Sequence, residues 1–252
     1  MLTVPGAGGR RGWYFPLKFS RRSLPVEKPQ VILLTGASRG IGAATASLLR
    51  QHGHHVAAVS RTPANTPGQL NLAADVSQEA EVQRAIAETL AHYGRLDAVI
   101  ANAGVGSFTE LENFTAAEFD RIFATNVRGT FLLAKYAVPH FKAQKSGHFI
   151  GIASDVSKRT FAHGTAYGAS KYAQDALLGS LRKEVRPHGI KVSVIYPGLV
   201  DTSFGGDAPN DPAKATTHLR PEDVAAAVAY VLHQPPQVVI DELMLHPLTQ
   251  EW

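Results

Sequence analysis

The sequence predicts a doubly wound α/β fold, in which helices cover both faces of a mostly parallel central sheet. Residues 31–42 read VILLTGASRGIG, an aliphatic and β-branched run typical of a strand buried on both faces, which turns abruptly into glycines. A helix-forming run, 43–51, follows at once. Buried-type strands then alternate with amphipathic runs along the chain, as parallel strands with crossover helices require.

The other elements are placed by their patterns. Apolar residues spaced four apart predict a helix over 78–93. A longer helix is expected over 116–140 with Asn126 in its middle, and a final helix should begin near Pro221, a residue suited to a first turn. Further strands are predicted at 54–60, 70–76, 96–101, 147–153, 191–196 and 238–245.

The glycine-rich turn predicts a binding site for a nucleotide phosphate. Strand, turn and helix in that order point backbone N–H groups and the positive end of the helix dipole at an anion. Gly36 lets the chain turn sharply, while Gly40 and Gly42 remove side chains where a pyrophosphate and the neighbouring strand approach closely. The spacing is G-x-x-x-G-x-G, and an ordinary tight turn is the alternative for so short a motif.

Length and composition exclude several classes of protein. A chain of 252 residues with 44% hydrophobic and 18% charged residues is ordinary for a globular α/β domain. No apolar run approaches the ~18 residues needed to cross a bilayer, so we expect a cytoplasmic protein without a membrane span. The absence of cysteine excludes disulfides and a thiol nucleophile. His52, His54 and His55 surround a glycine at a helix-to-strand turn, and we expect no metal site there.

The net charge of +4 is concentrated near the N-terminus. Residues 1–28 hold six of the 25 basic and one of the 21 acidic residues, which leaves 19 basic against 20 acidic residues elsewhere. We therefore expect no nucleic-acid partner for the body of the protein. Residues 1–28 are predicted to be a flexible basic extension, either a non-essential leader or a targeting or anionic-surface segment, followed by one domain over 29–252.

The end of the second predicted strand indicates the cofactor. An acidic side chain there would bind the adenosine ribose of NAD, but the chain offers Ser60 and Arg61, and the next acid is Asp75. Arg61, with Arg39 from the glycine turn, can pair with the 2′-phosphate of NADP through charge-assisted hydrogen bonds. NADP is therefore expected rather than NAD, and two solvated surface arginines are the alternative interpretation.

Ser154, Tyr167 and Lys171 are the candidate catalytic residues. Ser154 follows a predicted strand at its carboxyl end, where open α/β sheets bind ligands. Tyr167 and Lys171 are four apart and so share one face of a helix. Reduction of a ketone or aldehyde needs a hydride at carbon and a proton at oxygen. Positive charge from Lys171 and the oxidised nicotinamide would lower the ordinary phenol pKa of ~10.

Six spaced motifs together resemble the short-chain dehydrogenase/reductase family. They are TGASRGIG at 35–42, Asp-Val at 75–76, Asn-Ala-Gly at 102–104, Thr-Asn-Val at 125–127, Ser154 with Tyr-x-x-x-Lys at 167–171, and Pro-Gly-x-Val-x-Thr at 197–202. The resemblance covers roughly residues 30–247. It implies a Rossmann-like fold and an oxidoreductase that assembles as a homodimer or homotetramer.

The resemblance also implies a role for each matched residue. Tyr167 would be the general acid and Ser154 would donate to the carbonyl oxygen. Lys171 would hold the nicotinamide ribose, and Asn126 would kink its helix and position a water between Lys171 and solvent. The residues expected to contact NADP(H) are Gly36, Ser38, Arg39, Gly40, Ile41, Gly42, Ser60, Arg61, Asp75, Val76, Asn102, Ala103, Gly104, Tyr167, Lys171, Pro197, Gly198, Val200 and Thr202.

We therefore predict an NADPH-dependent reductase of a ketone or aldehyde. The alternatives are an NAD-dependent alcohol dehydrogenase on the same scaffold and a catalytically silent nucleotide-binding or redox-sensing protein. Asp155, Lys158 and Arg159 depart from the residues common in the family; they are either loop charges or substrate contacts, and the basic pair leaves an acidic substrate open. Residues 204–219 are expected to form a mobile lid over the substrate.

Overall fold

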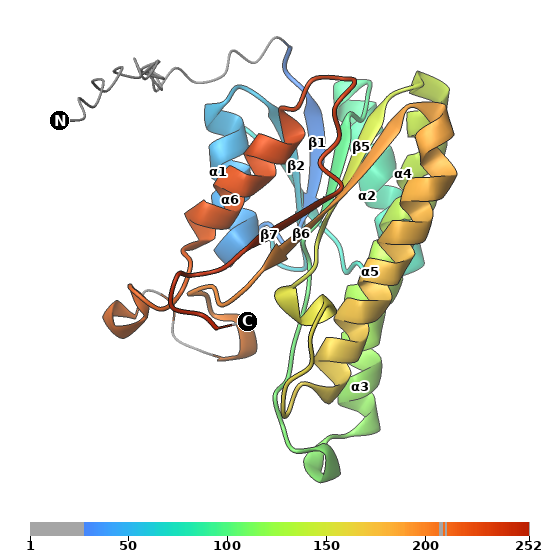
Figure 1. The fold of residues 1–252 in the computed structure, drawn as a ribbon. Helices are drawn as coiled ribbons and strands as arrows, with labels where there is room; N and C mark the ends of the chain where they lie inside the picture. The colour runs from blue at the N-terminus through green and yellow to red at the C-terminus, as the bar shows by residue number, and fades with distance from the viewer. Residues whose placement is uncertain (1–27, 207–208, 210, 252) are drawn as a thin grey trace, which may run out of the picture.

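A seven-stranded parallel sheet forms the centre of the molecule (Figure 1). The structure is a computed structural model that describes residues 28–206, 209 and 211–251, so the predicted basic extension, apart from Lys28, lies outside the described residues. The strand order is β3-β2-β1-β4-β5-β6-β7. The strands are β1 (Val31–Thr35), β2 (His55–Ser60), β3 (Leu70–Ala73), β4 (Ala98–Ala101), β5 (Gly147–Ile152), β6 (Ile190–Pro197) and β7 (Glu242–Leu245).

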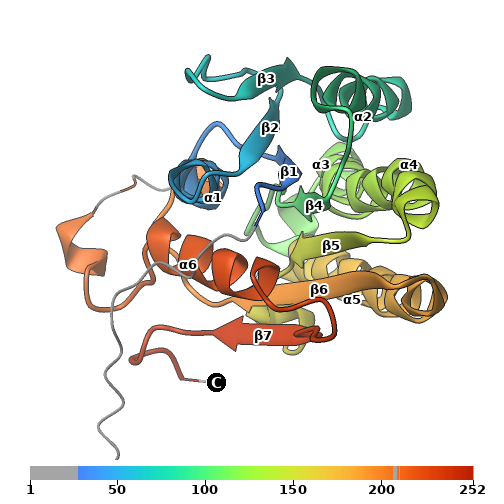
Figure 2. The same ribbon diagram turned by 90° about the horizontal axis from the view of Figure 1, so that it is seen from above.

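Helices cover both faces of this sheet, which confirms the predicted doubly wound fold (Figure 2). One face carries α1 (Gly40–Gln51) and α6 (Pro221–Leu232), and the other carries α2 (Glu79–Tyr93), α4 (Gly129–Gln144) and α5 (Thr165–Val185). Alternate residues of β1 supply the two cores: Ile32 and Leu34 pack in the cluster under α1 and α6, and Leu33 in the cluster under the other three helices. Within the described part of the chain, no helix has the length and apolar character that crossing a membrane requires.

The helix predicted over 116–140 is interrupted at Asn126, where the family resemblance implies a kink. α3 (Ala116–Phe123) runs into a π-helical turn, η2 (Ala124–Arg128), and α4 then continues past Pro139 to Gln144. Asn126 lies in this wider turn with no exposed surface. The cause is tertiary, because the Asn126 amide is hydrogen-bonded to the segment after β4 and to α5.

Two strands at the edges of the sheet are shorter than predicted. The last strand covers only Glu242–Leu245, because the N–H of Val238 closes a turn onto the carbonyl of Pro235 at 2.9 Å. β3 ends at Ala73 rather than at residue 76, because Asp75 begins the turn into α2 and accepts a hydrogen bond of 2.9 Å from the N–H of Ser77.

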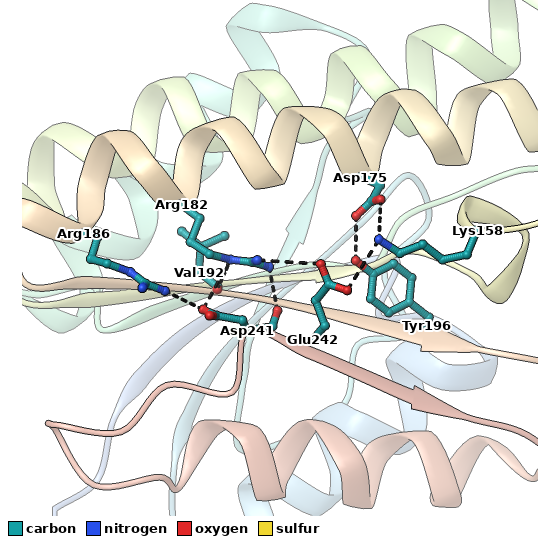
Figure 3. Close-up of polar contacts among 8 residues, drawn as sticks. All are labelled: Lys158, Asp175, Arg182, Arg186, Val192, Tyr196, Asp241 and Glu242. Atoms are coloured by element: carbon teal, nitrogen blue, oxygen red, sulfur yellow. Dashed lines mark hydrogen bonds and ion pairs between the residues drawn. The ribbon is translucent and has the colours of Figure 1, made fainter.

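An ionic network fixes the edge strand β7 to its neighbours (Figure 3). Glu242 of β7 lies 3.4 Å from Lys158 Nζ in the loop after β5 and 3.7 Å from the Arg182 guanidinium on α5. Lys158 also donates to Asp175 at 2.8 Å, and the hydroxyl of Tyr196 on β6 donates to the other oxygen of Asp175 at 2.6 Å. These contacts join β6, β7, α5 and the loop after β5. Lys158 lies between Asp175 and Glu242 and is held by both carboxylates.

Two histidines connect the end of α6 to the start of β2. His54 Nδ1 accepts a hydrogen bond of 3.1 Å from the N–H of Gln30, so the proton of its ring lies on Nε2, which is 2.8 Å from Nε2 of His233. Burial, followed by the neighbouring charges of His233, His52 and His55, lowers the pKa of His54 to about 4. His54 is therefore folded in its neutral form.

We expect the protein to lose stability in mild acid. The pKa of His54 is about 4 when folded and ~6.5 when unfolded, so its contribution is present above pH ~6.5 and is lost as the pH falls toward 4. The loss has a slope of at most about 1.4 kcal/mol per pH unit for one histidine. In urea unfolding between pH ~7 and ~5, His54→Gln should reduce the slope, whereas the exposed control His163→Asn should keep it. If the free energy of unfolding of His54→Gln fell with pH as steeply as that of the wild type, His54 would not be the group responsible.

Candidate active site

A cleft of about 460 Å³ opens at the carboxyl ends of the strands, where the strand order reverses between β1 and β4. Every residue predicted to contact NADP(H) lines this cleft. Ser154, Tyr167 and Lys171 line it as well. Asn126 does not; it lies behind the wall, and its neighbour Thr125 reaches the cleft instead.

The glycine turn is fixed by backbone geometry and by one asparagine. Gly36 has a φ of +66°, in the left-handed region that favours glycine. Gly42, in the first turn of α1, packs so closely that a Cβ there would collide with the Gly36 carbonyl and the Asn102 amide. That amide donates to the carbonyls of Thr35 at 2.8 Å and Gly36 at 3.2 Å. The N-terminus of α1 is therefore held against the cleft, as a phosphate site requires.

Two arginines make the β1–β2 end of the cleft positive. Arg39 and Arg61 both line the cleft and are exposed, and neither pairs with a carboxylate among the described residues. The carboxylate of Asp75, in contrast, accepts hydrogen bonds from the N–H and the hydroxyl of Ser77 at 2.9 and 2.7 Å. The β1–β2 end of the cleft therefore presents two guanidinium groups that no described carboxylate neutralises.

Three buried polar side chains meet in the other half of the cleft. Ser154 follows β5, and Tyr167 and Lys171 lie on α5; their residues are 8%, 9% and 4% exposed. The Ser154 hydroxyl donates to Asp155 Oδ1 at 3.1 Å and is near enough to the Tyr167 phenol to lower its pKa. Lys171 Nζ lies 5.8 Å from the centre of the Tyr167 ring and donates to the Ile152 carbonyl and to Gln174 Oε1, each at 3.0 Å.

Burial shifts the pKa values of both Lys171 and Tyr167. Burial lowers the pKa of Lys171 to about 7. Burial raises the pKa of Tyr167 to about 12, against a lowering by the nearby Ser154 hydroxyl and with a further rise from the Asp155 carboxylate. Desolvation is therefore the main influence on the phenol pKa in the protein by itself, and the lowering expected from positive charge beside the cofactor stays a prediction. Tyr167 keeps its proton at neutral pH.

Asn126 joins the segment after β4 to α5. Its side-chain oxygen accepts from the N–H of Val105 at 2.9 Å, and its amide hydrogens go to the Val105 carbonyl and the Ser170 hydroxyl, both at 2.9 Å. Ser170 in turn donates to the Tyr167 carbonyl at 2.7 Å. Asn126 thus braces the helix that carries Tyr167, and its predicted role in positioning water stays a prediction.

Gln174 is a buried polar residue that the sequence interpretation missed. It is 1% exposed, accepts from Lys171, and donates to the Thr130 hydroxyl at 2.9 Å. Thr130 donates to the Asn126 carbonyl at 2.8 Å, so a continuous hydrogen-bonded path runs from Lys171 to the interrupted helix. The sequence held one signal for Gln174: it lies three residues after Lys171, so the two side chains share one helix face.

The unusual loop after Ser154 is organised around a buried carboxylate. The side chain of Asp155 is 4% exposed and accepts from the Ser154 hydroxyl at 3.1 Å and from Arg159 at 2.6 and 3.0 Å. Gln250 Nε2 donates to the same carboxylate at 2.7 Å, and Gln250 Oε1 accepts from the N–H of Leu199 at 2.8 Å. A residue 95 positions later in the chain thus connects the loops after β5 and β6.

Aromatic rings border the catalytic half of the cleft. Phe108, in the loop after β4, lies 5.5 Å from the Tyr167 ring, and Phe204, after β6, lies 5.4 Å from it. Phe204 begins the segment expected to form a lid, of which residues 207, 208 and 210 lie outside the described residues. Neither phenylalanine was predicted, although each follows the carboxyl end of a strand, where such sheets bind ligands.

Known proteins with similar sequences and structures include dehydrogenases and reductases. The sequence profile described as short chain dehydrogenase matches residues 30–213. Sepiapterin reductase of Chlorobaculum tepidum is 32% identical over 235 residues, covering 86% of this chain and 96% of that protein. An alcohol dehydrogenase of Thermococcus sibiricus, solved with 5-hydroxy-NADP, is 32% identical with a TM-score of 0.82, covering 89% and 99% of the two chains. A 3-ketoacyl-(acyl-carrier-protein) reductase of Brucella melitensis, solved with NADH, is 27% identical with a TM-score of 0.80, covering 87% and 97%.

We expect the two substitutions Gly42→Ala and Gly179→Ala to have opposite effects. A methyl group at Gly42 would meet the Gly36 carbonyl, so the free energy of unfolding should fall by about 1–3 kcal/mol. At Gly179, in α5, a methyl group would meet no described atom within 4 Å beyond its own helix backbone, and alanine there should raise stability by about 0.5–1 kcal/mol through helix propensity. Guanidinium unfolding measures both. Equal stability of the two variants would show that the turn tolerates a side chain.

Proposed function

This chain belongs to the short-chain dehydrogenase family, and from that premise we propose that it is an NADPH-dependent oxidoreductase that reduces a ketone or aldehyde to an alcohol. The observation that carries the proposal is that Ser154, Tyr167 and Lys171 line the same cleft as the glycine turn. The proposal treats residues 29–252 as one catalytic domain that follows a basic extension.

The residues of the β1–β2 end fit NADP(H). The absence of side chains at Gly36 and Gly42 leaves the backbone and the N-terminus of α1 accessible to a pyrophosphate. Arg39 and Arg61 are exposed on the cleft wall and can pair with a 2′-phosphate. The complex of the Thermococcus sibiricus relative with 5-hydroxy-NADP supports this choice of cofactor. NADPH, when bound, would supply the hydride.

Tyr167 is the proposed general acid. Its pKa of about 12 keeps the phenol protonated, so a proton is available to the carbonyl oxygen while hydride reaches the carbon. Ser154 lies near that phenol and would turn its own hydroxyl from Asp155 to the same carbonyl oxygen. The two donors together would stabilise the negative charge that develops on this oxygen.

Lys171 is proposed to restore the proton. Its pKa of about 7 lets it exist in both protonation states near neutrality, and when charged it stabilises the phenolate left on Tyr167. Its contacts with Ile152 and Gln174 hold the amine beneath the ring. The path through Gln174 and Thr130 supports the predicted link toward Asn126.

We also propose a cytoplasmic enzyme that forms a homodimer or homotetramer through α4 and α5. These two helices pack side by side, and each carries an aromatic residue with a large exposed fraction: Phe131 on α4 is 49% exposed and Tyr172 on α5 is 41% exposed. Exposed apolar side chains on adjacent helices support a subunit contact there.

Tyr167→Phe should abolish turnover and leave nucleotide binding intact. Loss of a general acid should lower kcat by about 10²–10⁴-fold, whereas the Kd for NADPH should stay within about threefold of the wild-type value. Stopped-flow NADPH oxidation and calorimetry measure the two effects. Tyr172→Phe, on the same helix, is the matched control. Unchanged turnover in Tyr167→Phe would remove it as the acid, and a wild-type protein that binds NADPH but reduces no carbonyl compound would favour the silent nucleotide-binding alternative.

Arg61→Glu should discriminate between the two nucleotides. The Kd for NADPH should rise about 10–100-fold through loss of a charge-assisted hydrogen bond and repulsion of the 2′-phosphate, while the Kd for NADH changes little. Arg121→Glu, an equal charge reversal at an exposed site on α3, should leave both constants unchanged. Equal weakening of both nucleotides by Arg61→Glu would instead support the NAD-dependent alternative.

A further inference from the structure

We propose that the substrate is a neutral ketone or aldehyde with an aromatic group attached to its carbonyl carbon. This inference rests on the proposed reductase function and adds the chemical class of substrate. Because the carbonyl oxygen must lie at Tyr167 and Ser154, the groups attached to the carbonyl carbon must contact the side chains that surround these two residues.

Three of those side chains form an aromatic cluster, in which Phe204 lines the cleft and Phe108 packs against Phe204 and Tyr167. The ring of Tyr167 lies 5.5 Å from Phe108 with planes at 81°, and 5.4 Å from Phe204 with planes at 56°. Phe108 lies 6.3 Å from Phe204 and 5.9 Å from Phe161, whose loop precedes α5. Three loops, after β4, β5 and β6, thus each supply one phenylalanine: Phe108 and Phe204 pack against the ring of the proposed acid, and Phe161 packs against Phe108.

The aromatic cluster is built into the backbone of these loops. A side chain at Gly106 would come within 2.8 Å of the Phe204 ring, and one at Gly205 within 2.9 Å of the Phe108 ring. Phe108 and Phe161 nevertheless remain 44% and 37% exposed, although phenylalanine is among the most often buried residues. Exposed rings held in place at the mouth of a cleft are what a planar apolar group would cover by edge-to-face or offset contact.

The charges near the cluster disfavour an acidic substrate. Lys158 is held by Asp175 and Glu242, as Figure 3 shows, and Arg159 is bound to Asp155 at 2.6 and 3.0 Å. The basic pair that left an acidic substrate open in the sequence is therefore neutralised within the protein. Asp155, next to Ser154, is in turn paired with Arg159, so this loop offers a substrate carboxylate no unpaired positive charge.

The first experiment compares three carbonyl compounds at saturating NADPH: acetophenone, butanone and pyruvate. We expect kcat/KM to be about tenfold higher for acetophenone than for butanone, because an aryl group meets the rings and an ethyl group does not, and lowest for pyruvate. Equal or greater efficiency with butanone or pyruvate would overturn the inference while leaving the reductase proposal standing.

Substitutions then test whether the rings bind the aryl group or only exclude water. Phe108→Ala should lower kcat/KM about tenfold for acetophenone but less than about threefold for butanone, and Phe108→Tyr, which keeps the ring, should retain the wild-type ratio. Tyr230→Ala removes an aromatic ring that is 55% exposed on α6, outside the cleft, and is the control. An equal loss for both ketones in Phe108→Ala would show a general effect on Tyr167 and would contradict aryl recognition.

A binding measurement separates this inference from the proposed chemistry. The Tyr167→Phe protein keeps the ring at position 167 but lacks the proposed acid, so calorimetry on its NADPH complex measures ketone binding without turnover. We expect acetophenone to bind about tenfold more tightly than butanone. If Tyr167→Phe shows this preference but the wild-type protein reduces neither ketone, the aromatic site is upheld and the reductase proposal is overturned. If Tyr167→Phe binds the two ketones equally, only the aromatic site is overturned.

Discussion

The hydrogen bonds between the ends of β1 and β4 are the constraint on which the rest of the cleft depends. These two neighbouring strands send their chains to opposite faces of the sheet, so their last peptide groups lose the partners that a ladder supplies. Thr35 and Asn102 replace those partners: the Thr35 hydroxyl accepts from the N–H groups of Asn102 and Ala103 at 3.1 Å, and the Asn102 amide returns bonds to Thr35 and Gly36. The opening between the strands is thereby kept, and α1 starts at its edge.

The two halves of the cleft use opposite electrostatic conditions. At the β1–β2 end, Arg39 and Arg61 remain in solvent, where a charged phosphate can reach them without prior desolvation of the arginines. At the α5 end, burial moves the pKa of Lys171 down to about 7 and that of Tyr167 up to about 12, so both side chains favour their neutral forms more than they would in water. A developing negative charge there has few waters to stabilise it, which makes the positions of the protein donors decisive.

Features that depend on neighbouring residues could be predicted from the sequence, and features that depend on distant ones could not. The aliphatic run of β1, the glycine turn and the spacing of Tyr167 and Lys171 are local, and the structure places all three as expected. The break at Asn126 was expected only from the family resemblance, because Thr-Asn-Val by itself contains no helix breaker; the turn is held by Val105 and Ser170, 21 and 44 positions away. The early start predicted for β7 failed for a different reason. Residues 238–241 have strand-like composition, but the chain turns from Pro235 to Val238, and before Glu242 the ladder gains only the Asp241 carbonyl, which accepts from the N–H of Val194 at 3.0 Å.

The contact of Gln250 with Asp155 has a consequence for the order of events during synthesis. The glycine turn, β1 and β4 are complete once the first hundred or so residues of the chain have left the ribosome, whereas the loop beside Ser154 acquires its Gln250 partner only with the last residues described. Contacts of such sequence separation form late, after the loop-closing entropy of the intervening chain has been overcome. A nascent chain can therefore present the glycine turn and the β1–β2 end of the cleft before the reaction centre and the cleft residues that follow β6 have been made.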